Sequence, residues 1–262
     1  MQCNWTFWKE TRGGQILTLP CGKCLACRKE RARQWSIRLS HHLLYNPDAI
    51  FVTLTYNELT CPETLEKRHY QLFLKRLRKK FSHLKLKYYG CGEYGTNTHR
   101  PHWHILIFGL PIGIMKLERA GFTEGKWSSA IIKELWPFGH NVTGTVNEKS
   151  ISYVTGYLLK EKDPKRRIQF QSQALGESFI YDNEQRIRDF KLTRYGKKVT
   201  VPRYYIKKLG ILPHEIPELD RVAVEKGYED RTEYLLDGKR IFGHVQRERN
   251  LQAALSQQKR NI

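Results

Sequence analysis

Two histidines, His102 and His104, stand one residue apart at the start of the very apolar segment "HWHILIFG" (102–109). If this segment is a β-strand, both imidazoles point to one face and Trp103 points to the other, because side chains alternate along a strand. Two imidazoles at a fixed spacing on a rigid element are a good beginning for a metal site. The alternative is that either histidine only hydrogen-bonds to the backbone at the end of the strand.

Glu93 is the best candidate for a third ligand. It ends the segment "LKLKYYGCGE" (84–93), which a turn-rich stretch joins to His102, so we expect the two strand ends to be neighbours. Two imidazoles and one carboxylate leave coordination positions open for water and phosphate oxygens. Such a set accepts Mg²⁺ or Mn²⁺, and the nitrogen ligands favour Mn²⁺. His99 and His140 are alternative ligands.

A second group that could do chemistry lies in "SYVTGYLLKEK" (152–162). Tyr153, Tyr157 and Lys160 are spaced by four and three residues, so they share one face if the segment is a helix. A phenol, with a pKa of about 10, is a weak nucleophile until a metal polarises the phosphate and a cation stabilises the developing charge. The alternative is an aromatic stripe that packs on a sheet.

Cysteines form a third group, near the N-terminus. Cys21, Cys24 and Cys27 have the spacing C-x₂-C-x₂-C, and Cys3 is a candidate for a fourth thiolate. In a chain without a secretion signal this pattern favours metal over disulfide. Zn²⁺ is the simplest ion for a structural site of this kind, while an iron–sulfur cluster and uncoordinated thiols stay open as alternatives.

Composition points to a polyanionic partner. The 262 residues include 46 Lys+Arg against 26 Asp+Glu, a formal net charge of +20, which favours contact with nucleic acid over a merely basic, solvated surface. Aromatic residues alternate with basic ones in "KLKYYG", "LTRYGKKV" and "VPRYYIKK", which suits single-stranded nucleic acid. The sequence has neither a spanning apolar run nor a signal-peptide pattern, so we expect a cytosolic protein with no membrane partner.

The elements that must position these residues follow from hydrophobic periodicity. Expected strands are 49–56, 84–93, 102–109 and 140–146, and expected core helices are 65–81 and 128–136. The order β-α-β-β-α-β predicts an α+β fold with a ferredoxin-like or RRM-like antiparallel sheet in which 49–56 and 102–109 are central. Further helices are expected at 28–45 and 148–162.

Three regions follow from this pattern. Residues 1–48 form a cysteine-containing leader and helix, 49–163 the core, and 164–262 a basic, mainly helical extension. The sequence contains no phosphate-binding loop of the form G-x₄-G-K-[ST], so an NTP-driven motor is not expected here.

Together the motifs resemble a known family. The segments "FVTLTY" (51–56), "PHWHILIFG" (101–109) and "YVTGYLLK" (153–160) resemble, in order and spacing, the three motifs of the HUH (His-hydrophobe-His) endonucleases. The Tyr-x₃-Tyr form and the leader "PCGKCLACRKERARQW" (20–35) are similar to those of the rolling-circle replication initiators of gokushovirus-type microviruses, which are single-stranded DNA bacteriophages.

The resemblance implies a role for each matching residue. His102 and His104 would ligate the metal with Glu93 as the acidic third ligand, Tyr153 and Tyr157 would be nucleophiles, and Lys160 the accompanying cation. One tyrosine would nick single-stranded DNA at the phage replication origin and stay linked to the 5′-phosphate, and the other would act after one round of synthesis. A host helicase and DNA polymerase would be the partners, in the cytoplasm of the bacterial host.

Basic residues outside the motifs are candidates for holding the DNA. On the polar face of 65–81 these are Lys75, Arg76 and Lys79, and in 194–208 they are Arg203, Tyr204 and Lys207. Phosphate contacts would give a strong salt dependence, and Tyr195, Tyr204 and Tyr205 are candidates to stack on bases. A solvated helix face is the alternative for 65–81.

Two other functions stay open. A non-catalytic, RRM-like module that binds single-stranded nucleic acid would share the expected topology, although it needs exposed aromatics on the central strands. An HUH transposase or a plasmid relaxase would use the same chemistry for another purpose.

Overall fold

The computed structural model describes residues 6–10, 16–95, 98–119, 127–160 and 168–212, together with Cys3, Gly14 and Ile216. The chain divides into two compact units, one of residues 35–184 and the other of residues up to 34 with those from 185 onward. Among the helices of the described residues, none combines the length and the apolar character needed to cross a membrane.

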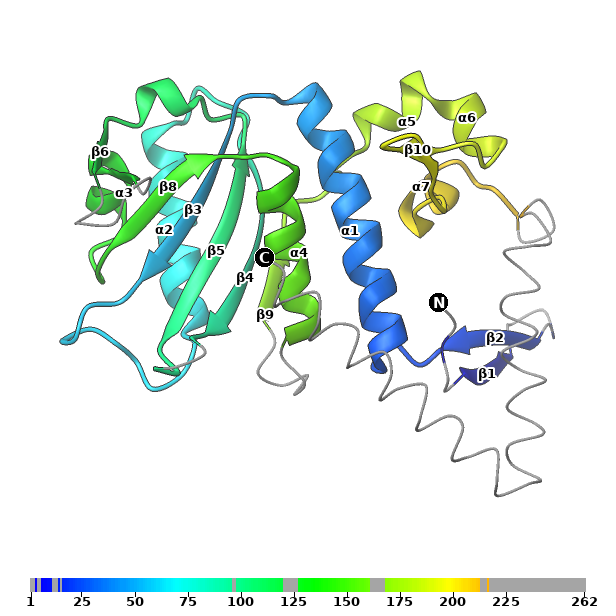
Figure 1. Cartoon of the computed structure of the whole chain (residues 1–262), viewed down its shortest axis with the longest axis horizontal. Helices are drawn as coiled ribbons and strands as arrows, with labels where there is room; N and C mark the ends of the chain where they lie inside the picture. Colours follow the sequence, from blue (N-terminus) through cyan, green and yellow to red (C-terminus); the bar gives the residue numbers. More distant parts are fainter. Residues whose placement is uncertain are drawn as a thin grey trace. The chain divides into compact units, whose positions relative to one another are not determined.

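The larger unit is built on a five-stranded antiparallel sheet (Figure 1). Its strand order is β8 (Asn141–Thr145), β3 (Ala49–Thr55), β5 (Pro101–Phe108), β4 (Lys87–Tyr94) and β9 (Ile168–Gln171). The predictions of an α+β fold and of a central position for "HWHILIFG" are confirmed. Strand β9 was not expected, and it carries the sheet past residue 163, where the sequence analysis ended the core.

Helices cover both faces of this sheet. On one face, α2 (Lys67–Lys80) and α3 (Ala130–Leu135) pack against residues of β3 and β5, and on the other face α1 (Leu25–Tyr45) and α4 (Glu148–Lys160) do so (Figure 1). A strand covered on both faces is apolar on both, which explains the unbroken run Ile-Leu-Ile-Phe in β5.

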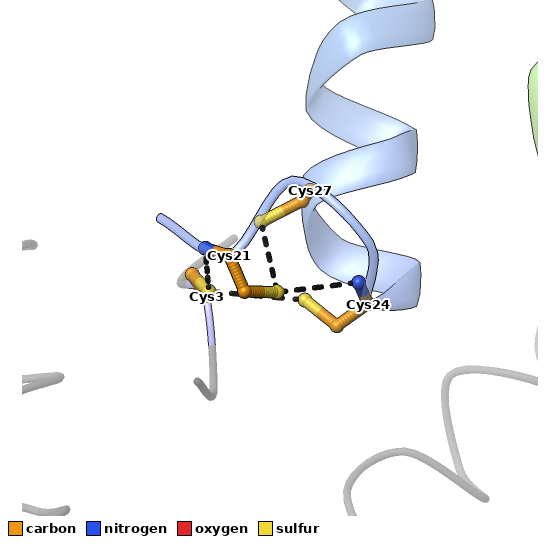
Figure 2. A group of neighbouring side chains, drawn as sticks. All are labelled: Cys3, Cys21, Cys24 and Cys27. Atoms are coloured by element: carbon orange, nitrogen blue, oxygen red, sulfur yellow. Dashed lines mark hydrogen bonds between the residues drawn. The ribbon is translucent and has the colours of Figure 1, made fainter. Parts of the chain in front are cut away.

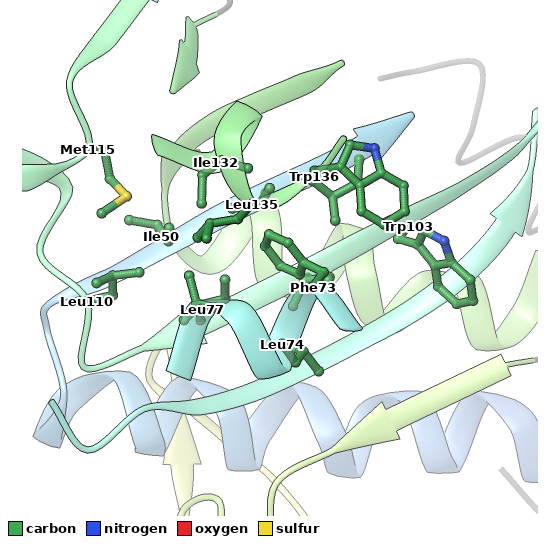
Figure 3. Packing of buried hydrophobic residues seen from close by; sticks show 14 of the residues in the cluster. Ile50, Phe73, Leu74, Leu77, Trp103, Leu110, Met115, Ile132, Leu135 and Trp136 are labelled. Carbon is green, nitrogen blue, oxygen red and sulfur yellow. The ribbon is translucent and has the colours of Figure 1, made fainter. Parts of the chain in front are cut away.

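The core under α2 is built around two tryptophans, Trp103 and Trp136, both fully buried (Figure 3). Phe73 and Leu77 of α2 reach into this cluster because their spacing places them on one face of the helix. Trp103 therefore points away from the face that carries its two neighbouring histidines, as the alternation of a strand predicts.

Two glycines in β4 set the packing that orients the next residue. A Cβ at Gly90 would lie 2.6 Å from the ring of Phe170, and one at Gly92 would lie 2.7 Å from the ring of Trp103. The glycines thus leave room for these rings on the α2 face of the sheet. Because side chains alternate, Glu93 is directed to the opposite face, where α4 lies.

The remaining elements are short. They are β1 (Thr6–Glu10), β2 (Ile16–Pro20), the 3₁₀ turn η1 (Ile112–Ile114), β6 (Leu117–Arg119), β7 (Trp127–Ser129), α5 (Ser178–Asp182), α6 (Glu184–Arg188), β10 (Thr193–Arg194), β11 (Lys197–Lys198) and α7 (Arg203–Lys208). The described part of the extension thus mixes strands with short helices, whereas a mainly helical extension was expected. The β1–β2 hairpin in the leader was also missed.

Helix boundaries differ from the expected ones by a few residues. Helix α1 begins at Leu25 instead of residue 28. The segment expected as helix 128–136 opens with β7, and α3 follows from Ala130. Ser129 caps α3, since its hydroxyl oxygen accepts a hydrogen bond from the Ile132 N–H at 3.3 Å.

Candidate metal centre and nucleophile site

Strand pairing brings the three expected ligands together. Glu93 of β4 lies directly opposite His102 of β5, and His104 follows two residues later on the same face. The Nε2 atom of His102 lies 2.8 Å from Oε1 of Glu93, and Nε2 of His104 lies 3.3 Å from the same oxygen. One carboxylate oxygen therefore faces two imidazole nitrogens.

The other nitrogen of each ring is held by a neighbour. Nδ1 of His102 lies 3.0 Å from the Arg100 carbonyl oxygen, which only accepts, so this nitrogen carries the proton. Nδ1 of His104 lies 3.0 Å from the hydroxyl of Thr53. Such partners orient a ligating histidine and leave Nε2 available to a metal.

The donor set fits a divalent cation. One ligand atom from each of Glu93, His102 and His104 lies within 4.8 Å of the others, and no other described residue completes a fuller set here. Two nitrogens and a carboxylate suit Mn²⁺ or Mg²⁺ with positions left for other oxygens.

Charge in the site is balanced by close partners. Burial by itself would raise the pKa of Glu93, but hydrogen bonds from His102, His104 and Lys160 outweigh it and bring this pKa well below its ordinary value. Burial lowers the pKa of His104, against the pull of the Glu93 carboxylate. The site thus presents an ionised carboxylate and a neutral imidazole, the forms that bind a metal.

Both tyrosines of α4 lie against the histidines. The ring of Tyr157 stacks on His104 with centroids 4.7 Å apart, and the ring of Tyr153 meets His104 edge-on at 5.3 Å. The two tyrosine rings are 4.9 Å apart. Helix α4 buries Ile151 and Val154 against the sheet, which leaves the tyrosines at the ligand end of the same face.

The two phenols differ in their surroundings. Tyr153 is 51% exposed, whereas Tyr157 is only partly exposed. Burial, the hydrogen bond with Tyr153 and the negative charge of Glu93 raise the pKa of Tyr157 well above its ordinary value. Deprotonation of Tyr157 therefore needs additional positive charge.

Lys160 supplies a positive charge at this place. Its Nζ lies 2.9 Å from Oε2 of Glu93 and 5.3 Å from the centre of the Tyr157 ring. The spacing Tyr-x₃-Tyr-x₂-Lys thus brings all three side chains to one point, as a helical face predicts.

Two residues of the site were not predicted as functional. Thr53 bonds His104, and the ring of Phe51 lies nearly parallel to that of His104 at 6.0 Å and edge-on to Tyr153 at 6.1 Å. Both belong to "FVTLTY", and residues 51 and 53 share a face by strand alternation. That spacing was the available signal, but the register that sets Thr53 opposite His104 is a long-range feature.

Thr53→Val removes the hydroxyl with little change of shape and leaves Nδ1 of His104 without its partner. We expect Mn²⁺ affinity to fall on the order of 10–100-fold, as is typical when such a partner of a ligand is lost. Calorimetric titration with Mn²⁺ measures this. Thr55→Val, on the same strand and face, is the matched control, since Thr55 bonds the His140 carbonyl instead. Equal affinities for the two variants would show that Thr53 does not position the ligand.

Other candidate ligands are not part of the group. His99 and His140 are exposed, and neither belongs to a cluster of metal-ligating atoms among the described residues. The four expected cysteines of the leader, in contrast, do come together, with their sulfur atoms within 4.8 Å of one another.

The basic residues of α2 lie on the other side of the sheet. Lys75 and Lys79 are exposed, and Arg76 donates a hydrogen bond to the Leu135 carbonyl at 3.3 Å. Helix α2 packs on the face opposite to Glu93 and the histidines. The structure does not bring these residues into the site.

The candidates near α7 belong to the smaller unit. Arg203 and Lys207 are exposed and Tyr204 is half-buried. Tyr205 is fully buried, so the expectation that it stacks on bases is wrong: on a short helix its side chain faces inward. Tyr195 is exposed, with the Arg194 guanidinium 5.3 Å from its ring centre.

Known proteins share this sequence. A profile of the family described as replication-associated protein ORF2 matches residues 49–162, which contain the ligands and both tyrosines. No solved structure matches the chain.

Three phage proteins are similar over most of the chain. Replication-associated protein ORF2 of Spiroplasma virus 4 is 31% identical over 219 residues, which cover 73% of this chain and 68% of that protein. Replication-associated protein VP4 of Bdellovibrio phage phiMH2K is 33% identical, covering 71% and 65% of the two chains. Replication-associated protein ORF4 of Chlamydia phage 1 is 28% identical, covering 77% and 56%.

The chain spans less than two thirds of the length of the last two relatives. The match to the Spiroplasma virus protein covers more than two thirds of it and includes most of this chain. This chain therefore belongs to the family of phage replication-associated proteins, that of the gokushovirus-type microvirus initiators.

Proposed function

We propose that the protein is an HUH-type nickase and strand transferase that starts rolling-circle replication by cutting DNA at the phage origin. The observation that carries this proposal is the convergence of two phenols, Tyr153 and Tyr157, on the ligand set of Glu93, His102 and His104. The strand order β8-β3-β5-β4, with the histidine pair in the middle, supports an HUH-type core with the ferredoxin-like arrangement.

Glu93, His102 and His104 are the residues that would hold Mg²⁺ or Mn²⁺. When bound, the ion would supply Lewis-acid polarisation of the scissile phosphate. The protein's own part is to keep Nε2 of both rings turned toward the carboxylate through Thr53 and the Arg100 carbonyl.

The reaction is a transesterification. The phenol oxygen of one tyrosine forms a bond to the phosphorus, and the bond from phosphorus to the 3′ oxygen of the preceding nucleotide breaks. The phenol loses one proton and the departing 3′ oxygen gains one, so the step consumes no cofactor. Lys160 stabilises the phenolate as it forms.

The products suit replication. The 3′-hydroxyl primes synthesis by a host polymerase, and the phosphotyrosine keeps the energy of the broken ester, so rejoining needs no ATP. The second tyrosine on the same helical face allows one site to cut the regenerated origin and to close the first strand into a circle.

Contacts that hold the DNA are assigned to exposed basic residues. Lys75 and Lys79 on α2 and Arg203 and Lys207 on α7 are exposed and suit phosphate binding. Affinity for single-stranded DNA should therefore fall steeply with salt. Membership of a phage replication family supports this role over a transposase or a plasmid relaxase.

The decisive experiment uses single-stranded oligonucleotides tiled over the DNA molecule that encodes this chain. They are incubated with the full chain and Mn²⁺, and covalent adducts are sought after denaturation in SDS. A nick with a 5′-phosphotyrosine link makes 3′-labelled DNA, but not 5′-labelled DNA, travel with the protein. Chelation of the metal with EDTA is expected to abolish the adduct.

The label also separates the alternatives. Label from 5′-ends on the protein would contradict the proposed polarity. Tight binding of the oligonucleotides with no adduct from any of them would instead support the non-catalytic binding module.

A further inference from the structure

The cysteine cluster of the smaller unit lies outside the chemistry proposed above. Its sulfur atoms, from Cys3, Cys21, Cys24 and Cys27, point toward one another (Figure 2). The pairs Cys21–Cys27 and Cys3–Cys24 are each separated by 3.9 Å between sulfur atoms. Sulfur atoms in a disulfide lie about 2.05 Å apart, so these contacts are not disulfide bonds.

The spacing suits one ion. Zn–S bonds of about 2.3 Å in a tetrahedron place the sulfur atoms about 3.8 Å apart, close to the observed 3.9 Å. A cluster of several irons is wider than a single ion and would hold the four thiolates farther apart than the 4.8 Å limit observed.

Backbone N–H groups are directed at the sulfur atoms. The Cys21 N–H donates to Sγ of Cys3 at 3.2 Å, and the N–H groups of Lys23 and Cys24 donate to Sγ of Cys21 at 3.4 and 3.3 Å. Such donors stabilise thiolates over thiols. The turn that directs two of them needs Gly22, whose φ of +70° is costly for other residues.

The ligands come from three different places in the unit. Cys3 precedes β1, Cys21 follows β2 directly, and Cys24 and Cys27 lie at the start of α1. An isolated two-stranded hairpin is marginally stable, and this one leaves apolar residues exposed, with Phe7 at 50% and Ile16 at 65%. Apolar burial alone is thus a weak anchor for the hairpin.

We propose that Cys3, Cys21, Cys24 and Cys27 bind one structural Zn²⁺ that fastens the β1–β2 hairpin to the start of α1. Four thiolates leave no open position on the ion, so this site is structural and separate from the nicking chemistry.

Elemental analysis of the purified full chain tests the proposal, with about one zinc per chain expected. Replacement of the metal by Co²⁺ should give the intense visible bands and thiolate charge-transfer bands of a tetrahedral thiolate site. Cys24→Ser should lose the zinc and be cut faster by trypsin after Lys23, which is exposed in the turn. Cys61→Ser, outside the cluster, should keep the metal.

Three results would overturn the proposal. They are a folded chain without zinc and without cobalt thiolate bands, iron together with acid-labile sulfide, or equal zinc content in Cys24→Ser and Cys61→Ser. The cobalt spectrum is measured on the unaltered chain, so the test stands even where Cys24→Ser fails to fold.

Discussion

Changing both Tyr153 and Tyr157 to phenylalanine is expected to abolish the covalent protein–DNA adduct while the chain stays folded. The substitutions remove only two hydroxyl groups and keep the rings that pack on His104 at 4.7 and 5.3 Å. Loss of a nucleophile costs factors on the order of 10⁶ in rate, so adduct should fall below detection. Adduct is measured with 3′-labelled origin DNA, and the fold by circular dichroism and thermal melting.

Single substitutions should separate the two phenols. Tyr153 is 51% exposed and open to incoming DNA, whereas Tyr157 is partly covered and stacked on His104. We therefore expect Tyr153→Phe to reduce the first cleavage more strongly than Tyr157→Phe. Each single variant should still form some adduct, but neither should complete a circle, because circle closure needs a second nucleophile.

Tyr181→Phe is the matched control for these variants. Tyr181 is exposed on α5 and outside the site, so its loss should leave cleavage unchanged. Adduct formation by the double variant, or an adduct mapped by mass spectrometry to a peptide without Tyr153 and Tyr157, would show that the nucleophile lies elsewhere.

Glu93→Gln is expected to lower both Mn²⁺ binding and adduct formation by a factor on the order of 10² or more. The amide keeps the size of the side chain but removes the charge that a divalent ion requires, and this charge is the shared partner of His102, His104 and Lys160. Removing one ligand of three disturbs the site more than removing a partner of a ligand, for which losses on the order of 10–100-fold are typical.

The measurement is a Mn²⁺ titration of the full chain, followed by cleavage assays at increasing Mn²⁺. Partial rescue of cleavage at high Mn²⁺ is expected, because both imidazoles remain. His140→Gln alters an exposed histidine outside the group and should behave like the unaltered chain. Unchanged metal affinity in Glu93→Gln would remove Glu93 from the ligand set and leave the histidines alone as ligands.

Local patterns were a reliable guide to the parts of the site. The strand alternation that sets His102 and His104 on one face, and the helical spacing of Tyr153, Tyr157 and Lys160, are properties of neighbouring residues along the backbone. They hold wherever the segment forms its element, so they could be predicted without any knowledge of packing.

Long-range packing was harder to predict. Strand β9 lies past the expected end of the core and pairs with β4, where Phe170 fills the space left by Gly90. The apolar pattern of four residues in β9 is too short to reveal its partner. The basic stripe of α2 was predicted correctly as a helix face, but which face of the sheet α2 covers was decided by the burial of Phe73 and Leu77.

The sequence by itself thus determined the identity of the reactive groups and their grouping in pairs and triples along single elements. Only the tertiary structure decided that Glu93 meets His102, that Thr53 orients His104, and that α4 brings its phenols to the same sheet face. The physical reason is that residue spacing sets geometry over one or two turns. Contacts between elements depend on which apolar faces bury one another, and this is a property of the whole chain.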